Sequence, residues 1–192
     1  QFEIVLPGNQ PLNHKPGQFV EVSIFGYGEA PISICSSPTK IPGFELTVRK
    51  VGRLTDKMHR MASGSTIGIR GPFGNGFDVD KFKGRDIVFI CGGIGLAPLK
   101  SLIDYTIARR KDFGRLVILY GTKNPLEILY KEDIKIWEEK NDIEFQMTVD
   151  HADKNWKGNT GVITTLIPAL ELNAENTIVT VVGPPIMYKF VI

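Results

Sequence analysis

The chain has few of the sequence features that directly indicate a class of protein, such as many cysteines, long apolar runs or a strong net charge. It contains two cysteines among 192 residues, too few for a disulfide framework. No apolar run reaches the roughly 18 residues of a membrane-spanning helix, and no signal peptide is evident. A net charge of +2 argues neither for nor against nucleic-acid binding, but the sequence has no run of basic residues and no interleaved aromatic residues of the kind that bind nucleic acid. We therefore expect a cytoplasmic protein with no membrane span and no nucleic-acid partner.

Residues that often carry catalysis or hold metals are also scarce. Cys35 and Cys91 each lie in an apolar, strand-like run, which is typical of small core residues rather than of a metal site. Buried free thiols fit a reducing cytoplasm. His14, His59 and His151 lie in polar or loop contexts, and we interpret all three as surface residues. We therefore expect no metal site within this chain and no serine–histidine or histidine–carboxylate catalysis.

The first part of the chain, residues 1–84, has the pattern of a β-rich domain. Short runs rich in Val, Ile and Phe alternate with glycines and prolines, and closely spaced strands of this kind favour a small antiparallel barrel. One helix interrupts them, with Thr55 as its candidate N-cap. The expected strands are Phe2–Leu6, Gln18–Phe25, Ala30–Ser36, Phe44–Val51 and Thr66–Arg70.

The second part, residues 85–192, alternates strands with helical patterns. This alternation predicts a doubly wound parallel sheet, and hence a β plus α/β fold with its boundary near Lys81–Arg85. The chain starts within an expected strand and ends soon after a helix begins at Pro185, so we expect the natural protein to extend beyond both ends. The expected elements are strands Asp86–Cys91, Leu116–Tyr120, Glu144–Val149 and Thr177–Val182, and helices Ala97–Arg110, Tyr130–Lys140 and Val162–Leu170.

The stretch Ile87–Leu102 carries the strongest chemical signal. A buried strand ends at Gly92, Gly93 and Gly95, and an apolar-periodic helix follows. The start of such a helix presents backbone N–H groups and a positive dipole end, and glycine lets that backbone approach a ligand closely. This geometry suits the pyrophosphate of a dinucleotide. Pro98 stands where the usual fingerprint has Gly or Ala, so the loop alone could also be a tight strand–helix turn.

Two segments of the β-rich part could serve a second nucleotide. Ala30–Ser33 is either a plain strand or a strand that presents a functional hydroxyl. The helix that starts near Thr55 offers N–H groups to a second pair of phosphates. Arg49, Lys50 and Arg53 would add positive charge there, although the same segment also suits a strand end, a turn and a helix cap.

Six short motifs follow one another in the order APIS at 30–33, TVRKVGRLT at 47–55, GPFG at 71–74, GGIGLAP at 92–98, YGTK at 120–123 and VGPPIM at 182–187. This order resembles the ferredoxin–NADP reductase superfamily, in which a flavin-binding barrel precedes a nicotinamide-binding domain. The likeness is greatest to electron-transfer subunits of multisubunit enzymes. These are the electron-transfer subunit of dihydroorotate dehydrogenase, the gamma subunit of sulfhydrogenases, the B subunit of anaerobic sulfite reductase, and the small subunit of NADH-dependent ferredoxin–NADP reductase.

The resemblance implies that the first domain binds FAD. Ser33 would lie near the reactive edge of the flavin ring, which makes it the candidate catalytic residue. Leu54 and Thr55 would hold the FAD pyrophosphate through their backbone N–H groups. The residues that the resemblance assigns to FAD are Ala30, Pro31, Ile32, Ser33, Thr47, Val48, Arg49, Leu54 and Thr55.

The resemblance also implies that the second domain binds NAD(P)H. Thr122 and Lys123 would face the adenosine ribose, and the last motif would approach the nicotinamide ring. No acidic residue ends the second strand of this domain, where NAD sites usually have one, so NADP(H) is slightly favoured over NAD(H). The residues assigned to this cofactor are Gly93, Gly95, Ala97, Pro98, Thr122, Lys123, Gly183, Pro184 and Met187.

Three positions depart from the family pattern. Ala30 stands where relatives carry Arg, so one phosphate-neutralising charge is missing and Arg49 or Arg53 would have to replace it. Val182 stands where many relatives have Cys, so no thiol takes part beside the nicotinamide. The chain stops before the cysteines that hold a two-iron, two-sulfur cluster in such proteins, so that cluster would lie beyond Ile192.

The implied reaction is hydride transfer between C4 of NAD(P)H and N5 of FAD, in which the protein orients the two rings. A larger redox subunit or ferredoxin would exchange electrons with the flavin. Two other functions stay open: a free-standing NAD(P)H:flavin reductase, and a non-catalytic assembly module that has lost its flavin. The flavin content of the purified protein separates an enzyme from an assembly module.

Overall fold

The computed structural model describes residues 1–191, which form two compact units. Unit 1 contains Gln1–Phe77 and Ala97–Ala108, and unit 2 contains Asp78–Leu96 and the chain from Arg109 onward. The helical segment of unit 1 is thus inserted in sequence between two strands of unit 2. The boundary expected between residues 84 and 85 divides the chain into two continuous segments, and it remains a prediction.

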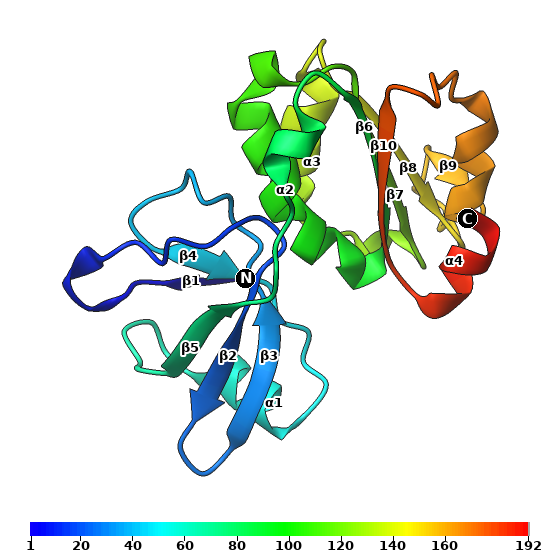
Figure 1. Cartoon of the computed structure of the whole chain (residues 1–192). Coiled ribbons are helices and arrows are strands. Elements are labelled where there is room, and N and C mark those ends of the chain that lie inside the picture. Colours follow the sequence, from blue (N-terminus) through cyan, green and yellow to red (C-terminus); the bar gives the residue numbers. More distant parts are fainter. Residues whose placement is uncertain (192) are drawn as a thin grey trace. The chain divides into compact units, whose positions relative to one another are not determined.

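Within the described residues, unit 1 holds five antiparallel strands in two small sheets (Figure 1). These strands are β1 (Phe2–Ile4), β2 (Phe19–Ile24), β3 (Gly28–Ser33), β4 (Phe44–Leu46) and β5 (Gly68–Phe73). β1 pairs with β4, and β2 lies between β3 and β5. An isolated antiparallel bridge joins Ile34, directly after β3, to Leu46 in β4. The predicted antiparallel, β-rich first part is confirmed.

The core of unit 1 forms from the inward side chains of these strands. Val20 and Val22, two residues apart in β2, are fully buried, and Phe44 of β4 packs in the same cluster. Successive side chains of a strand point to opposite faces, so this spacing puts both valines on one face. Helix α1 (Arg53–Arg60) adds Leu54 and Met58, which lie four residues apart on one side of the helix.

The start of α1 differs from the sequence expectation. The predicted N-cap, Thr55, is wrong, because the helix begins at Arg53 and Thr55 is its third residue. The Thr55 hydroxyl instead accepts hydrogen bonds from the backbone N–H groups of Val51 and Gly52 at 3.0 and 2.9 Å. Thr55 thus lies within the helix, and its side chain holds the two residues that precede the helix in place.

His14 lies in the interior of unit 1, so its interpretation as a surface residue is wrong. Its side chain is 7% exposed, and its Nε2 lies 3.1 Å from the carbonyl oxygen of Ser36. The hydroxyl of Ser101, in helix α2 (Leu96–Ala108), donates to the same oxygen at 2.6 Å. Burial lowers the pKa of His14, so the site favours the neutral ring with Nε2–H as the donor.

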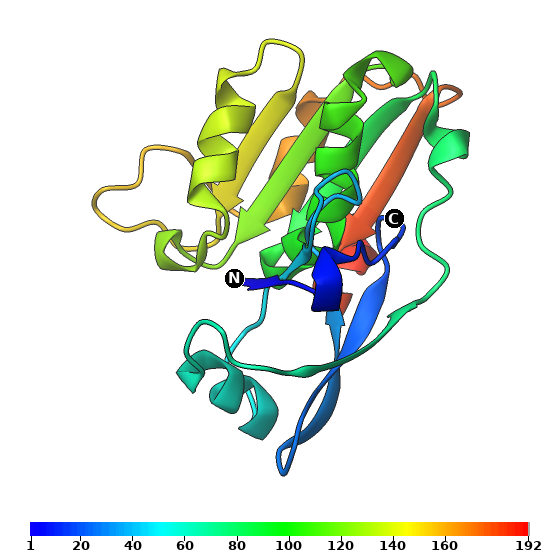
Figure 2. The same cartoon turned by 90° about the vertical axis from the view of Figure 1, so that its left-hand side faces the viewer.

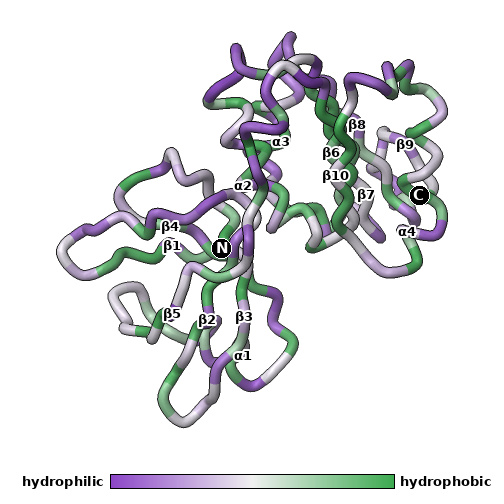
Figure 3. The backbone as a smooth tube through the Cα atoms, viewed as in Figure 1, coloured by the Kyte–Doolittle hydropathy of each residue, from purple (hydrophilic) through white to green (hydrophobic). Residues whose placement is uncertain are grey.

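Within the described residues, unit 2 contains a five-stranded parallel sheet (Figure 2) in the order β10-β6-β7-β8-β9. Nearly every residue of β6 and β7 is buried, and both strands contain continuous apolar runs, Ile87–Cys91 and Leu116–Leu119, within the sheet whose hydropathy Figure 3 shows. Parallel strands covered on both faces have this composition. The strands are β6 (Asp86–Gly92), β7 (Leu116–Thr122), β8 (Glu144–Val149), β9 (Asn159–Thr160) and β10 (Thr177–Val182).

Helices cover both faces of this sheet, as a doubly wound fold requires. On one face, Ile163 of the 3₁₀ helix η6 (Ile163–Ala169) packs in one cluster with Val117 and Leu119 of β7. On the opposite face, the ring of Trp137 in α3 (Lys131–Glu139) lies 6.0 Å from the ring of Phe145 in β8. The predicted doubly wound sheet is confirmed.

Two elements of unit 2 differ from the prediction. The expected helix at Val162–Leu170 is a 3₁₀ helix, and it contains Pro168, which lacks the N–H that an α-helical bond would need. The sequence does not predict β9, because its two residues are polar and show no apolar alternation. α4 (Pro185–Val191) starts where the sequence predicts, and Cys35 and Cys91 are buried free thiols, as expected.

Candidate functional site

The expected flavin residues of unit 1 begin on β3, which is an edge strand of its sheet. Ala30 and Ile32 pack against the core cluster of unit 1. Pro31 and Ser33 alternate with them and so point to the opposite face. Pro31 has no N–H to donate, which an edge strand tolerates. The face that carries Ser33 is therefore the one that β3 presents away from the core.

The segment that follows β4 carries the next expected residues. The hydroxyl of Thr47 donates to Sγ of buried Cys35 at 3.3 Å, and Val48 is buried. The Val48 carbonyl oxygen lies 2.9 Å from Nε2 of His59 in the last turn of α1. Arg49 is exposed. The structure thus holds residues 47–48 firmly and leaves the Arg49 side chain at the surface.

The start of α1 brings the last expected flavin residues close to β3. Leu54 and Thr55 are buried, and the first helical hydrogen bond runs from Asp56 N–H to the Gly52 carbonyl oxygen at 2.8 Å. The N–H groups of the first helical turn, including that of Leu54, have no acceptor within the helix. These donors and the dipole of α1 suit an anion.

In unit 2, the glycine loop packs against the end of β10. A Cβ on Gly95 would lie 2.3 Å from the carbonyl oxygen of Val182, and a Cβ on Gly92 would lie 2.8 Å from Cδ of Pro184. This close approach of two chain segments explains both glycines without a ligand. Gly93 differs, because its φ is 55° and a Cβ there would meet nothing within 4 Å. Gly93 is the loop position whose backbone borders open space.

The other expected nicotinamide residues lie close to this loop in sequence or in space. Ala97 and Pro98 belong to the first turn of α2, where proline loses no helical bond. A Cβ on Gly183 would lie 2.4 Å from Cε of Met187. Met187 itself is 7% exposed and packs with Val88 of β6, so its side chain supports the loop from within the core.

At the end of β7, the structure adds an acidic residue that the sequence pattern does not reveal. The buried Thr122 hydroxyl has no hydrogen-bond partner among residues 1–191. Asp150 follows β8 and donates its N–H to the Thr122 carbonyl oxygen at 2.9 Å, and His151 does the same to Lys123 at 2.9 Å. In sequence, such an acid is expected at the end of the second strand of the domain, which is β7. Asp150 instead follows the third strand, β8, so that expectation does not find it.

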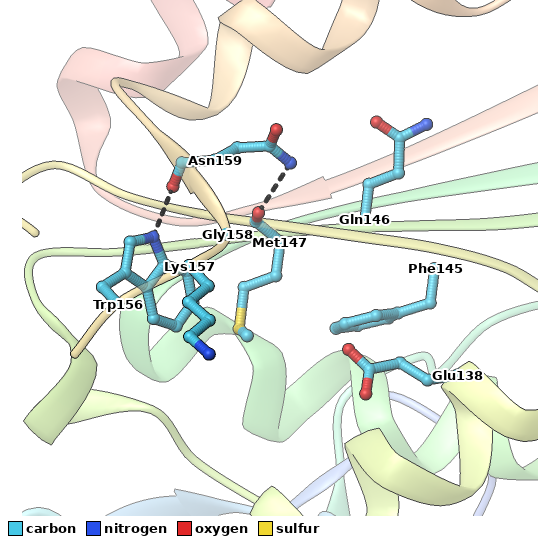
Figure 4. Close-up of a pocket in the computed structure, with 8 residues that line it drawn as sticks. All are labelled: Glu138, Phe145, Gln146, Met147, Trp156, Lys157, Gly158 and Asn159. Carbon is cyan, nitrogen blue, oxygen red and sulfur yellow. Dashed lines mark hydrogen bonds between the residues drawn. The ribbon is translucent and has the colours of Figure 1, made fainter.

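A separate pocket of about 490 Å³ lies at the outer edge of β8 (Figure 4). Phe145 and Met147 of β8 and the indole of Trp156 line it. Trp156 Nε1 donates to the Asn159 carbonyl oxygen at 2.9 Å, and Asn159 Nδ2 donates to the Met147 carbonyl oxygen at 3.1 Å. None of the residues expected to bind cofactor lines this pocket.

Residues 1–191 contain no group of three or more His, Cys, Asp or Glu side chains that could hold a metal ion. None of the helices in the same range is both long enough and apolar enough to cross a membrane.

Comparisons with known proteins decide the family. A family model described as "Oxidoreductase NAD-binding domain" matches residues 89–192. The gamma subunit of sulfhydrogenase 2 from Pyrococcus furiosus is 41% identical over 191 residues, which cover 93% of this chain and 65% of that protein. The chain belongs to the ferredoxin–NADP reductase superfamily. The probable dihydroorotate dehydrogenase B (NAD(+)) electron transfer subunit of the same organism is 31% identical over 180 residues, covering 93% of this chain and 63% of that protein.

Solved structures show the same ferredoxin–NADP reductase-like fold. The cytochrome b5 reductase domain of Ulva prolifera nitrate reductase matches with a TM-score of 0.81 at 20% identity, covering 98% of this chain and 82% of that one. A ferredoxin NADP+ reductase from Neisseria gonorrhoeae, with bound FAD and NADP, matches with a TM-score of 0.75 at 24% identity, covering 98% and 80%. The chain spans less than two thirds of the length of the curated relatives named above.

Proposed function

We propose that this chain is the FAD-dependent electron-transfer part of an oxidoreductase, which moves electrons between NAD(P)H and an iron–sulfur partner. The observation that carries the proposal is its 41% identity, over 93% of the chain, to a sulfhydrogenase gamma subunit. Two further features support it: helical N–H groups without a helical acceptor at α1 in unit 1, and the open backbone at Gly93 in unit 2.

The residues of unit 1 fit FAD. In our proposal the N–H groups at Leu54 and Thr55 bind the pyrophosphate, and the α1 dipole adds to that attraction. Thr47, Val48 and Arg49 run beside the rest of the molecule, and Ala30–Ser33 line the flavin ring, with Ser33 near its reactive edge. The fixed positions of Thr47 and Val48 suit a binding surface that must not reorganise.

The residues of the glycine loop, with the chain that follows it and the ends of β7 and β10, fit a nicotinamide dinucleotide. The pyrophosphate approaches the backbone of Gly93, and Gly95, Ala97 and Pro98 continue this binding segment into α2. The adenosine ribose lies beside Thr122 and Lys123, where the unpartnered Thr122 hydroxyl gains a hydrogen bond. Gly183, Pro184 and Met187 form the end of the site nearest the nicotinamide.

Asp150 leads us to favour NAD(H) over NADP(H). The backbone of Asp150 is bonded to that of Thr122, and in our proposal its carboxylate accepts hydrogen bonds from the ribose hydroxyls, whereas it would repel a 2′-phosphate. Lys123 is exposed and would favour the phosphate, but it stands alone. The name of one relative, which includes NAD(+), agrees with this preference.

The chemistry requires little of the protein beyond placement. FAD, when bound, supplies a ring that accepts a hydride from the nicotinamide. The chain's own residues bind and orient the two cofactors, and no side chain has to move a proton. The iron–sulfur cluster is assigned to the partner, a larger redox subunit or ferredoxin, or to chain outside these residues, because Cys35 and Cys91 are both buried in apolar surroundings.

The test is the absorbance of the purified protein after incubation with FAD. We expect bound-flavin bands that bleach on addition of NADH under anaerobic conditions, and more slowly with NADPH. A protein that takes up no FAD would contradict the proposal and support an assembly module. If the flavin bands bleach but no iron–sulfur protein co-purifies with the chain, the result would support a free-standing flavin reductase.

A further inference from the structure

The turn that joins β2 to β3 contacts α1 through an aromatic ring. Tyr27 lies in this turn, with its N–H bonded to the Ile24 carbonyl oxygen at 2.9 Å. The Arg53 guanidinium carbon lies 5.3 Å from the centroid of the Tyr27 ring, and the Lys57 Nζ lies 5.5 Å from it. One half-exposed ring thus contacts two cations that are four residues apart on the same side of the helix.

The other charges nearby are already paired. Asp56 binds Lys50 at 2.8 Å and Arg60 at 2.6 Å. On β3, Glu29 pairs with Arg70 of β5. Within residues 1–191, neither of the two cations beside Tyr27 forms an ion pair with an acidic side chain. They are therefore available to an anion from outside the chain.

The charge of the whole segment shows the same excess. Residues 49–60 contain five Lys or Arg and one Asp, a net charge of +4 in a chain whose total is +2. Two like charges on adjacent turns of a helix repel each other and cost stability unless something offsets them. The electron-rich face of the Tyr27 ring offsets part of that repulsion and limits where both cations can go.

The position of this cluster matches a gap in β3. Tyr27 lies three residues before Ala30, which is apolar and packs against the core, and Ala30 is the position at which the family resemblance leads us to expect an arginine. Arg53 directly precedes Leu54 and Thr55, the backbone donors assigned to the FAD pyrophosphate. The cations are thus held by the turn that leads into β3, the strand that lacks the expected charge.

We propose that Tyr27 is a positioning residue that holds Arg53 and Lys57 as a clamp for the FAD pyrophosphate, in place of the arginine missing at Ala30. The proposal rests on the proposed function, since it assumes that FAD binds at α1. It extends that function by naming Tyr27 and Lys57, neither of which lies in the six motifs given above.

The test compares FAD with riboflavin, which has the same ring system but no phosphate. Dissociation constants are measured by flavin fluorescence on flavin-free protein. We expect Tyr27→Leu to weaken FAD binding about two- to fivefold, the range of an exposed cation–π contact. Tyr27→Phe keeps the ring face and should bind FAD like the wild type. The double variant Arg53→Gln/Lys57→Gln should weaken FAD binding about tenfold or more and flatten its salt dependence. Riboflavin binding should stay unchanged in all three.

Three outcomes overturn the proposal in distinguishable ways. If Tyr27→Leu or the double variant binds FAD with wild-type affinity, the clamp is disproved, but the proposed function is not affected. Equal weakening of FAD and riboflavin shows general damage to the site rather than loss of a phosphate contact. A wild-type protein that binds no FAD overturns the proposed function, and the clamp with it. Thermal unfolding of each variant checks that the exposed turn still folds.

Discussion

At the scale of the residue, the glycines of the nicotinamide loop serve different purposes. Gly92 and Gly95 are required by the chain at the end of β10, which leaves no room for a Cβ. A Gly95→Val variant would therefore fail in packing before it could report on a ligand. Gly93 is the position where substitution leaves the protein's own contacts intact, and so it is the position that tests binding.

We predict that Gly93→Ala raises the KM for NADH about tenfold, because the added methyl group stands where the pyrophosphate approaches the backbone. Steady-state kinetics of the FAD-loaded protein measure this. Gly84→Ala is the matched control, since Gly84 also has a positive φ, 71°, and open space around its Cβ position. Equal changes in KM for the two variants would show that backbone strain, not a blocked ligand, is responsible.

Asp150 gives the second prediction at this scale. We expect Asp150→Ala to raise kcat/KM for NADPH relative to NADH about tenfold, because removing the carboxylate removes its repulsion of a 2′-phosphate. Asp153→Ala, in the same loop and also exposed, controls for the loss of a charge nearby. An unchanged ratio in Asp150→Ala would separate Asp150 from the ribose site.

At the scale of the element, the Ser36 carbonyl oxygen ties three segments of unit 1 together, because it accepts from His14 and from Ser101 of α2. Burial holds the pKa of His14 below its value in the unfolded chain. Below the unfolded pKa near 6.5, the unfolded state therefore binds more protons than the folded state, and the free energy of unfolding falls as the pH falls.

We predict that the wild type loses stability between about pH 7 and pH 5, by at most about 1.4 kcal/mol per pH unit from this one group. His14→Gln should show a shallower pH dependence over that range, because its amide does not titrate. Urea unfolding at a series of pH values measures the slope, with His151→Gln, at an exposed site, as the control. A slope in His14→Gln as steep as in the wild type would exclude His14 as its source.

The sequence predicted elements with strong apolar patterns best. The bounds of β8 and β10 agree with expectation. β6 and β7 extend by one and two residues beyond expectation, and their apolar runs are typical of parallel strands that are covered on both faces. Local sequence signals predicted the role or the burial of a residue less well where contacts with distant segments determine it. Thr55 has the composition of a cap but acts from inside the helix, and His14 is surrounded by polar sequence yet buried by other segments.

The candidate site was predictable in part for the same reason. The motif residues of β3, α1 and the glycine loop lie together in sequence, so their order revealed them. Asp150 and Tyr27 become visible only when the strands and helices are assembled. The first depends on the pairing of β7 with β8, and the second on the turn between β2 and β3 meeting α1.

At the scale of the whole molecule, unit 1 is discontinuous in sequence, because it contains Ala97–Ala108 as well as Gln1–Phe77. A fragment of residues 1–84 lacks the Ser101 hydroxyl that binds the Ser36 carbonyl oxygen. We predict that this fragment shows no cooperative thermal transition by circular dichroism, whereas the intact chain does. A sharp transition at the temperature of the intact chain would show that residues 1–84 are an independent domain.

The prolines of unit 1 have a consequence for its behaviour in concentrated solution. β3 and β5 are the outer strands of their sheet, and each contains a proline, Pro31 and Pro72. An open sheet edge normally offers a row of amide donors to any passing strand, and a proline interrupts that row. Both edges of this sheet are therefore poor templates for intermolecular pairing, which guards the protein against aggregation although, within residues 1–191, no named strand extends the sheet beyond β3 or β5.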